Sequence, residues 1–150
     1  MLPIKRKFNM SPVEPSIKSF LISDMVIQEK GTNKWSAIGI FDNIIATQFP
    51  LVYPRLALYI RLSDAEGDYD IRVEFCDDKD CVIAIFEGIR FSIPSRLHNP
   101  ELGITTLNLP IQKPGKFNFK LYFNGKWVGD FPLIVEEYNK NKGKDIDYVE

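Results

Sequence analysis

Residues 56–75 read LALYIRLSDAEGDYDIRVEF, and this stretch decides the fold. Apolar side chains recur at every second position in both halves, and the polar turn 63–68 lies between the halves. Successive side chains of a β-strand point to opposite faces, so this period of two predicts two antiparallel strands. Each strand is expected to turn one apolar face toward a core.

The same alternation recurs along the rest of the chain. The apolar residues of 117–123 share one face, and Asn124-Gly125 after them predict a type I′ hairpin, which needs φ > 0 at both central residues. Further strands are expected over 17–28, 35–46, 82–86 and 105–111. About eight strands without a helix-length amphipathic segment predict an all-β fold, a two-sheet antiparallel β-sandwich of Ig-like or C2-like architecture. A closed barrel is the alternative.

The length of 150 residues suits one domain with a single core. The 10 prolines and 9 glycines favour short strands over long helices. We expect an irregular lead-in over 1–15, a single sandwich domain over 16–137 and a polar C-terminal tail over 138–150.

The net charge is −1, from 19 basic and 20 acidic residues spread along the chain. A positive field that would hold nucleic acid is therefore not expected. Lys18, Asp24 and Lys30 interrupt the N-terminal region, so no apolar segment of signal-peptide or membrane length occurs there. We expect a cytoplasmic protein that binds neither nucleic acid nor a membrane.

Cys76 and Cys81 flank the turn 77–80. Neighbouring strands would bring them to a separation that permits a disulfide, but two reduced thiols are expected in the cytoplasm. A zinc site would need two more ligands, and the single histidine, His98, lies far along the chain. No cofactor is expected.

Residues 82–86 are apolar at every position. Such a run predicts a strand buried on both faces, either central in its sheet or in contact with another subunit. A homo-oligomer or a protein partner, bound through a strand edge or an apolar sheet face, is therefore expected.

Several segments carry a resemblance to a known family. They are VIQEKGT (26–32), IGIFD (38–42), QFP (48–50), RLSDAEG (61–67), Pro114-Gly115, the Phe-rich strand and the Asn-Gly hairpin. Their order resembles a family of small bacterial proteins known only as a domain of unknown function, over roughly residues 17–137. The resemblance implies a bacterial β-sandwich without an assigned activity, and it supplies no functional residues.

Four carboxylates, Asp64, Glu66, Asp68 and Asp70, alternate through one turn. Ca²⁺ takes several oxygen ligands, so this loop has suitable chemistry, although the EF-hand spacing is missing. A second acidic cluster over 77–80 would lie at the opposite end of the intervening strand, roughly 25 Å away at about 3.3 Å per residue. We therefore interpret the loop as a solvated turn, with metal binding as the alternative.

If consecutive strands are antiparallel, every second loop lies at the same end of the domain, and four loops are expected to meet there. These are 29–34, 63–68, 93–104 and 124–126. That end would bring Lys30, Lys34, Arg96 and His98 close to the acidic loop, as for a polar ligand. The same composition is typical of ordinary surface loops.

No catalytic motif is found in the chain. Its serines lack a G-x-S-x-G context, phosphate-loop and dinucleotide patterns are missing, and His98 falls in a surface loop. Trp35 and Trp127 are interpreted as packing residues rather than stacking platforms. The sequence predicts a non-enzymatic binding or interaction module, with a metal- or polar-ligand-binding sandwich that uses the 64–70 loop as the alternative.

Overall fold

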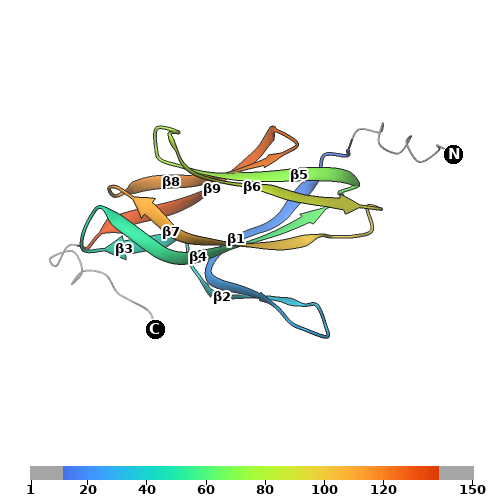
Figure 1. The fold of residues 1–150 in the computed structure, drawn as a ribbon, viewed down its shortest axis with the longest axis horizontal. Coiled ribbons are helices and arrows are strands. Elements are labelled where there is room, and N and C mark those ends of the chain that lie inside the picture. The colour runs from blue at the N-terminus through green and yellow to red at the C-terminus, as the bar shows by residue number, and fades with distance from the viewer. Residues whose placement is uncertain (1–11, 139–150) are drawn as a thin grey trace.

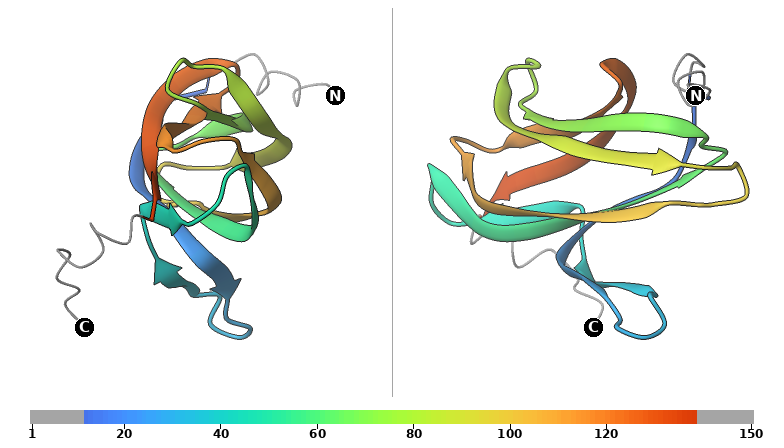
Figure 2. Two further views of the ribbon diagram at one scale, coloured as in Figure 1. Left: turned by 90° about the vertical axis from the view of Figure 1, so that its left-hand side faces the viewer. Right: turned by 45° about the vertical axis from the view of Figure 1, so that its right-hand side comes forward.

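The computed structural model describes residues 12–138, which form two packed β-sheets and no helix (Figures 1 and 2). The strands are β1 (Ser16–Gln28), β2 (Trp35–Ile40), β3 (Asn43–Ala46), β4 (Leu51–Ser63), β5 (Gly67–Cys76), β6 (Val82–Ile93), β7 (Glu101–Ile111), β8 (Gly115–Phe123) and β9 (Lys126–Glu137). One sheet has the order β2-β1-β4-β7 and the other β3-β9-β8-β5-β6. The predicted two-sheet sandwich is confirmed.

The core lies between the inward faces of β4, β5, β8 and β9. The apolar faces predicted from the alternation are fully buried there, namely Leu56, Leu58, Ile60, Leu62, Ile71, Val73, Phe75, Phe119 and Leu121. The Phe75 ring stacks on Phe117 at 5.3 Å between centroids and contacts Phe119 at 4.9 Å. These aromatic contacts hold the middle of β5 against β8.

The prediction of one strand over 35–46 is wrong. The chain leaves β2 of the first sheet at Phe41, whose N–H donates to Ile22 O at 2.9 Å, and then enters β3 of the second sheet. β3 pairs in parallel with β9, unlike the other strand pairs in the described part of the chain. Nine strands therefore replace the expected eight, because only residues 41 and 42 separate the two strands and so short a crossing gives no loop signal in the sequence.

The apolar run 82–86 does not form a central strand. It opens β6, which is an edge strand that pairs only with β5 among the described residues. Val82 and Ile85 are exposed, and Ile83 is half-buried. The run is thus buried on one face. Of the two predicted alternatives, the central strand is wrong, because composition does not show whether a strand has one neighbour or two, and contact with another subunit stays a prediction.

The Asn124-Gly125 turn is confirmed. Asn124 has φ 51° and Gly125 has φ 80°, so both central residues are left-handed. The Asn124 side chain also accepts a hydrogen bond from Asp70 N–H at 2.8 Å and donates one to Asp68 O at 3.2 Å. The turn therefore fixes the end of β8 against β5 as well as against β9.

Replacing Gly125 by valine is expected to lower the free energy of unfolding by about 1 kcal/mol or more, because a β-branched residue is strained at positive φ. Gly125→Asn is the matched control, since asparagine tolerates the left-handed region and should cost less. Urea denaturation measures both variants. Equal midpoints for wild type and Gly125→Val would contradict this account of the turn.

The lead-in is described only from Pro12 onward. Val13 N–H donates to Glu66 O at 3.1 Å, which joins the lead-in to the loop between β4 and β5. The predictions for residues 1–11 and 139–150 lie outside the described residues. No helix long and apolar enough to cross a membrane occurs in residues 12–138.

Candidate functional site

The four carboxylates of the acidic turn lie in different surroundings. Asp64 and Glu66 belong to the loop between β4 and β5, whereas Asp68 and Asp70 lie on β5 itself. Asp68 accepts a hydrogen bond from Ser92 Oγ at 2.6 Å, and Asp70 lies 3.8 Å from Arg90 Nε. The structure therefore ties two of the four candidates to β6. Across residues 12–138, no group of three or more metal-ligating side chains is placed to hold an ion.

Melting curves measured with about 1 mM Ca²⁺ and with a chelator are expected to overlay. A site with a dissociation constant of about 10 µM would stabilise the fold by roughly 2.7 kcal/mol under these conditions, or about 5–10 °C. An upward shift of several degrees that disappears in Asp64→Asn or Asp68→Asn would contradict the prediction and favour a metal-binding role.

Three of the four predicted loops share one end of the sandwich. Strand pairing brings the loops 64–66, 94–100 and 124–125 to that end, since Gly67 pairs with Ile93 and Arg61 with Glu101. Arg96 and His98 lie there, exposed, on the loop between β6 and β7. Lys30 and Lys34 do not join them, because they lie near the tip of the β1–β2 hairpin, which stands out below the sandwich in Figure 1.

The two cysteines are free in the structure. Cys76 is buried at the end of β5 and pairs in register with Val82 of β6. Cys81 is exposed at the end of the turn between these two strands. Burial, reinforced by the Glu74 carboxylate, raises the pKa of the Cys76 thiol above its usual value. A protonated, buried thiol is a poor nucleophile, so Cys76 contributes to packing rather than to chemistry.

Trp127 is not the packing residue that its position predicts. Its ring is exposed on the outer face of the second sheet, and its Nε1 donates to Asp130 Oδ1 at 2.7 Å. Asp130 in turn accepts from Lys120 Nζ, which also lies 3.3 Å from Asp80. The charged groups around Trp127 are therefore paired with one another.

Trp35 packs as predicted, and it seats the β1–β2 hairpin on the first sheet. Its ring lies 6.2 Å from Tyr59, on the outer face of β4. A Cβ atom at Gly103 of β7 would lie 2.9 Å from Trp35 Cζ3 and 3.0 Å from Val26 Cγ1. Glycine at this position is thus what allows the hairpin to approach β7 closely.

The opposite face of the hairpin is apolar and open to solvent. Strand register pairs Met25 with Ile38 and Ile27 with Ser36, which places these side chains on one face, away from Trp35 and Val26. Ile27 is 44% exposed, Ile38 50% and Ile40 59%. We call Ile27, Ile38, Ile40 and the free edge of β2 the hairpin surface.

The edge of β2 also lacks the protection found on the other edge strands. β6 carries Glu87 and Arg90 and has a register irregularity beside Gly88, β7 contains Pro110, and β3 has only 4 residues. Charges, prolines, bulges and short length all discourage a further strand from pairing with an edge. β2 reads WSAIGI and carries no charge and no proline, although it has only 6 residues and Gly39 distorts it at φ 70°.

Reasoning from the sequence missed the hairpin surface. The segment 35–40 was included in a strand that continued to residue 46, so its exposed isoleucines were expected to belong to the sandwich. The available signal was the absence of charge over 35–40 beside the polar turn 29–34. That signal becomes informative only once β2 is known to be an edge.

The fold and this surface define an all-β sandwich module with an apolar, unprotected hairpin. The chain belongs to a family of unknown function (DUF6941), whose model matches residues 18–136. The resemblance to an uncharacterised domain family is thereby confirmed. No curated protein matches the chain.

Two solved structures resemble this chain at low sequence identity. The alkylpurine DNA glycosylase AlkC of Pseudomonas fluorescens, bound to DNA containing an abasic site analog, matches with a TM-score of 0.53 at 12% identity, over 82% of this chain. This chain spans only 30% of that glycosylase. An immunoglobulin-like protein of Pseudomonas aeruginosa matches with a TM-score of 0.44 at 13% identity, over 83% of this chain and 98% of that one.

Proposed function

We propose that this protein is a non-enzymatic interaction module that assembles through the hairpin surface, and that its partner is a second copy of the chain. The observation that carries the proposal is the combination, on one hairpin, of an unprotected strand edge with an apolar face open to solvent. A strand laid along β2 would satisfy its free N–H and C=O groups and would cover Ile38 and Ile40.

A second copy suits this edge for reasons of symmetry and charge. In a two-fold arrangement the same patch serves both partners, and antiparallel pairing brings each β2 against its own copy. Like charges directly opposite each other would destabilise such a pair, but β2 carries no charged residue. Two copies of Ile27, Ile38 and Ile40 would then form one apolar strip, within an interface expected to bury about 1,200 Å² or more in total.

A non-enzymatic role is supported by the surroundings of His98. In the described part of the chain its one hydrogen bond is from its backbone N–H to Ser95 O, at 3.1 Å.

The DNA named with the glycosylase structure concerns that protein, and the net charge of −1 favours no nucleic-acid role here. A bacterial source and a cytoplasmic location remain predictions.

Sedimentation velocity from micromolar to near-millimolar concentration tests the proposal. Wild-type protein is expected to form dimers, and Ile38→Lys is expected to remain monomeric, because a lysine on the edge leaves a charge uncompensated in the paired strands. Ile85→Lys on β6 is the matched control, since Ile85 is 51% exposed and lies on an edge strand of the other sheet.

Dimers of Ile85→Lys together with monomers of Ile38→Lys would support assembly through β2. Dimers lost only in Ile85→Lys would move the interface to β6. A wild-type protein that remains a monomer at every concentration would exclude the second copy as partner.

A further inference from the structure

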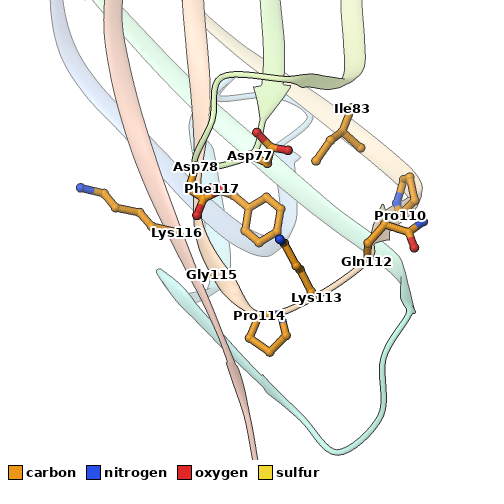
Figure 3. Close-up of a pocket in the computed structure, with 10 residues that line it drawn as sticks. All are labelled: Asp77, Asp78, Ile83, Pro110, Gln112, Lys113, Pro114, Gly115, Lys116 and Phe117. Carbon is orange, nitrogen blue, oxygen red and sulfur yellow. The ribbon is translucent and has the colours of Figure 1, made fainter.

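A cavity of about 270 Å³ opens at the end of the sandwich opposite the acidic loop (Figure 3). It lies between the turn that joins β5 to β6 and the turn that joins β7 to β8. Its lining is mostly apolar and includes Phe117, Ile83, Pro110 and Pro114. Typical ligand pockets measure about 300–1,000 Å³, and this cavity lies just below that range, which limits it to a small ligand.

The floor of the cavity is preorganised. Phe117 is buried, and its ring stacks on Phe75 with an interplanar angle of 8°, so it belongs to the core as well as to the cavity. Pro110 and Pro114 stiffen the backbone on the β7–β8 side. A ligand would therefore meet a rigid apolar surface and would lose little affinity to ordering the protein.

Charges of both signs border this floor, the carboxylates of Asp77 and Asp78 and the amines of Lys113 and Lys116. Asp77 comes from the β5–β6 turn, where its Oδ1 accepts hydrogen bonds from Lys79 N–H and Cys81 N–H, both at 2.9 Å. The same two hydrogen bonds lower the pKa of the Asp77 carboxyl, which keeps it ionised. Lys113 comes from the β7–β8 turn and forms no ion pair within residues 12–138.

Figure 3 shows how these charges are directed. Asp77 lies above the Phe117 ring in this view, and the Lys113 amine approaches the ring from below. Lys116, although it also lines the cavity, extends away from the ring. The opening therefore presents an anion on one turn and a cation on the other, with an apolar floor between them.

We propose that this cavity binds a small zwitterion with an apolar body, for which an apolar amino acid is the simplest example. The ligand carboxylate pairs with Lys113, the ligand ammonium pairs with Asp77, and the apolar body covers Phe117 and Ile83. A simple carboxylic acid would be repelled by Asp77, and a simple amine by Lys113. The proposal is independent of the hairpin surface, which lies on another part of the molecule.

The test uses L-phenylalanine as the probe and follows backbone amides of the full chain by NMR. Binding is expected to shift the amides of 77–83 and 112–117. 3-Phenylpropionate, which lacks the ammonium group, and phenethylamine, which lacks the carboxylate, are expected to bind about tenfold more weakly, because each leaves one charged hydrogen bond unmade.

Two variants remove one charge each. Lys113→Gln and Asp77→Asn are expected to weaken binding of L-phenylalanine about tenfold. Asparagine retains the side-chain oxygen that accepts from Lys79 N–H and Cys81 N–H, so the turn should keep its shape. Lys116→Gln is the matched control and should change the affinity by less than about twofold, because the Lys116 amine points away from the ring although the residue borders the cavity.

Three results would overturn the proposal. The first is the absence of shifts in these amides up to the solubility limit of L-phenylalanine. The second is a loss of affinity in Lys116→Gln equal to that in Lys113→Gln. The third is equal affinity for 3-phenylpropionate and L-phenylalanine, which would mean that the Asp77 charge does not take part.

Discussion

Replacing Phe75 by alanine is expected to lower the free energy of unfolding by about 3–5 kcal/mol, the usual cost of removing a fully buried phenylalanine from a core. Phe75 is completely buried in β5, and its ring contacts both Phe117 and Phe119 of β8. Alanine would leave a cavity between these strands that neither neighbouring ring could fill without leaving its own contacts. Urea denaturation followed by tryptophan fluorescence measures the change.

Phe75→Leu provides the control, because it keeps most of the apolar volume and should cost clearly less than the alanine variant. A loss below about 1 kcal/mol in Phe75→Ala would mean that the site collapses freely and that the two sheets do not depend on this aromatic stack.

Removal of the Tyr69 hydroxyl is expected to have the second largest effect, about 1–3 kcal/mol in Tyr69→Phe. Tyr69 is buried on β5, and its hydroxyl donates to Val13 O and accepts from Glu66 N–H at 2.9 Å. Phenylalanine would leave the Glu66 N–H and Val13 O without this partner and would leave the lead-in held to the β4–β5 loop by the Val13 N–H bond to Glu66 O. A loss of about 2 kcal/mol corresponds to a fall of roughly 4–8 °C in melting temperature.

Tyr53→Phe is the matched control for this variant. Tyr53 is half-buried on β4, and within residues 12–138 its hydroxyl feels burial and the Asp24 charge but no hydrogen bond. Its removal should therefore change the melting temperature by little. Similar melting temperatures for Tyr69→Phe and wild type would show that the hydroxyl does not hold the lead-in.

The fold class could be predicted because local alternation reports directly on burial. The apolar faces of 56–62, 69–75 and 117–123 are the inner faces of β4, β5 and β8, as the period of two indicates. The Asn124-Gly125 turn could be predicted as well, since few residue pairs adopt positive φ twice in succession. Both signals depend on residues that are close together in the chain.

The sheet membership of strands could not be predicted in this way. The chain crosses from β2 to β3 within two residues, and β3 then pairs with β9, which lies about ninety residues further along. Similarly, the apolar run 82–86 has the composition of a central strand but lies at an edge. Which strands become neighbours is decided by the packing of the whole sandwich.

The candidate sites also differ in whether their residues are close together in the chain. Sequence alone indicated the acidic turn, whose carboxylates lie within seven residues of the chain. The structure, however, ties Asp68 and Asp70 to β6 and separates Lys30 and Lys34 from Arg96 and His98. The hairpin surface emerges only when β2 is an edge and Gly103 lets Trp35 pack on the first sheet. The cavity emerges only when two turns that are far apart in sequence, around Asp77 and Lys113, close over Phe117.

The sequence by itself therefore determined that this protein is an all-β domain, which strands bury which face, and where its tightest hairpin turns. These properties follow from the alternation of side chains and from backbone preferences, which act over a few residues. Tertiary structure alone decided which edge is left unprotected and which charges meet at the cavity. These depend on contacts between strands distant in the chain, where the burial of apolar surface in a shared core selects one arrangement of sheets.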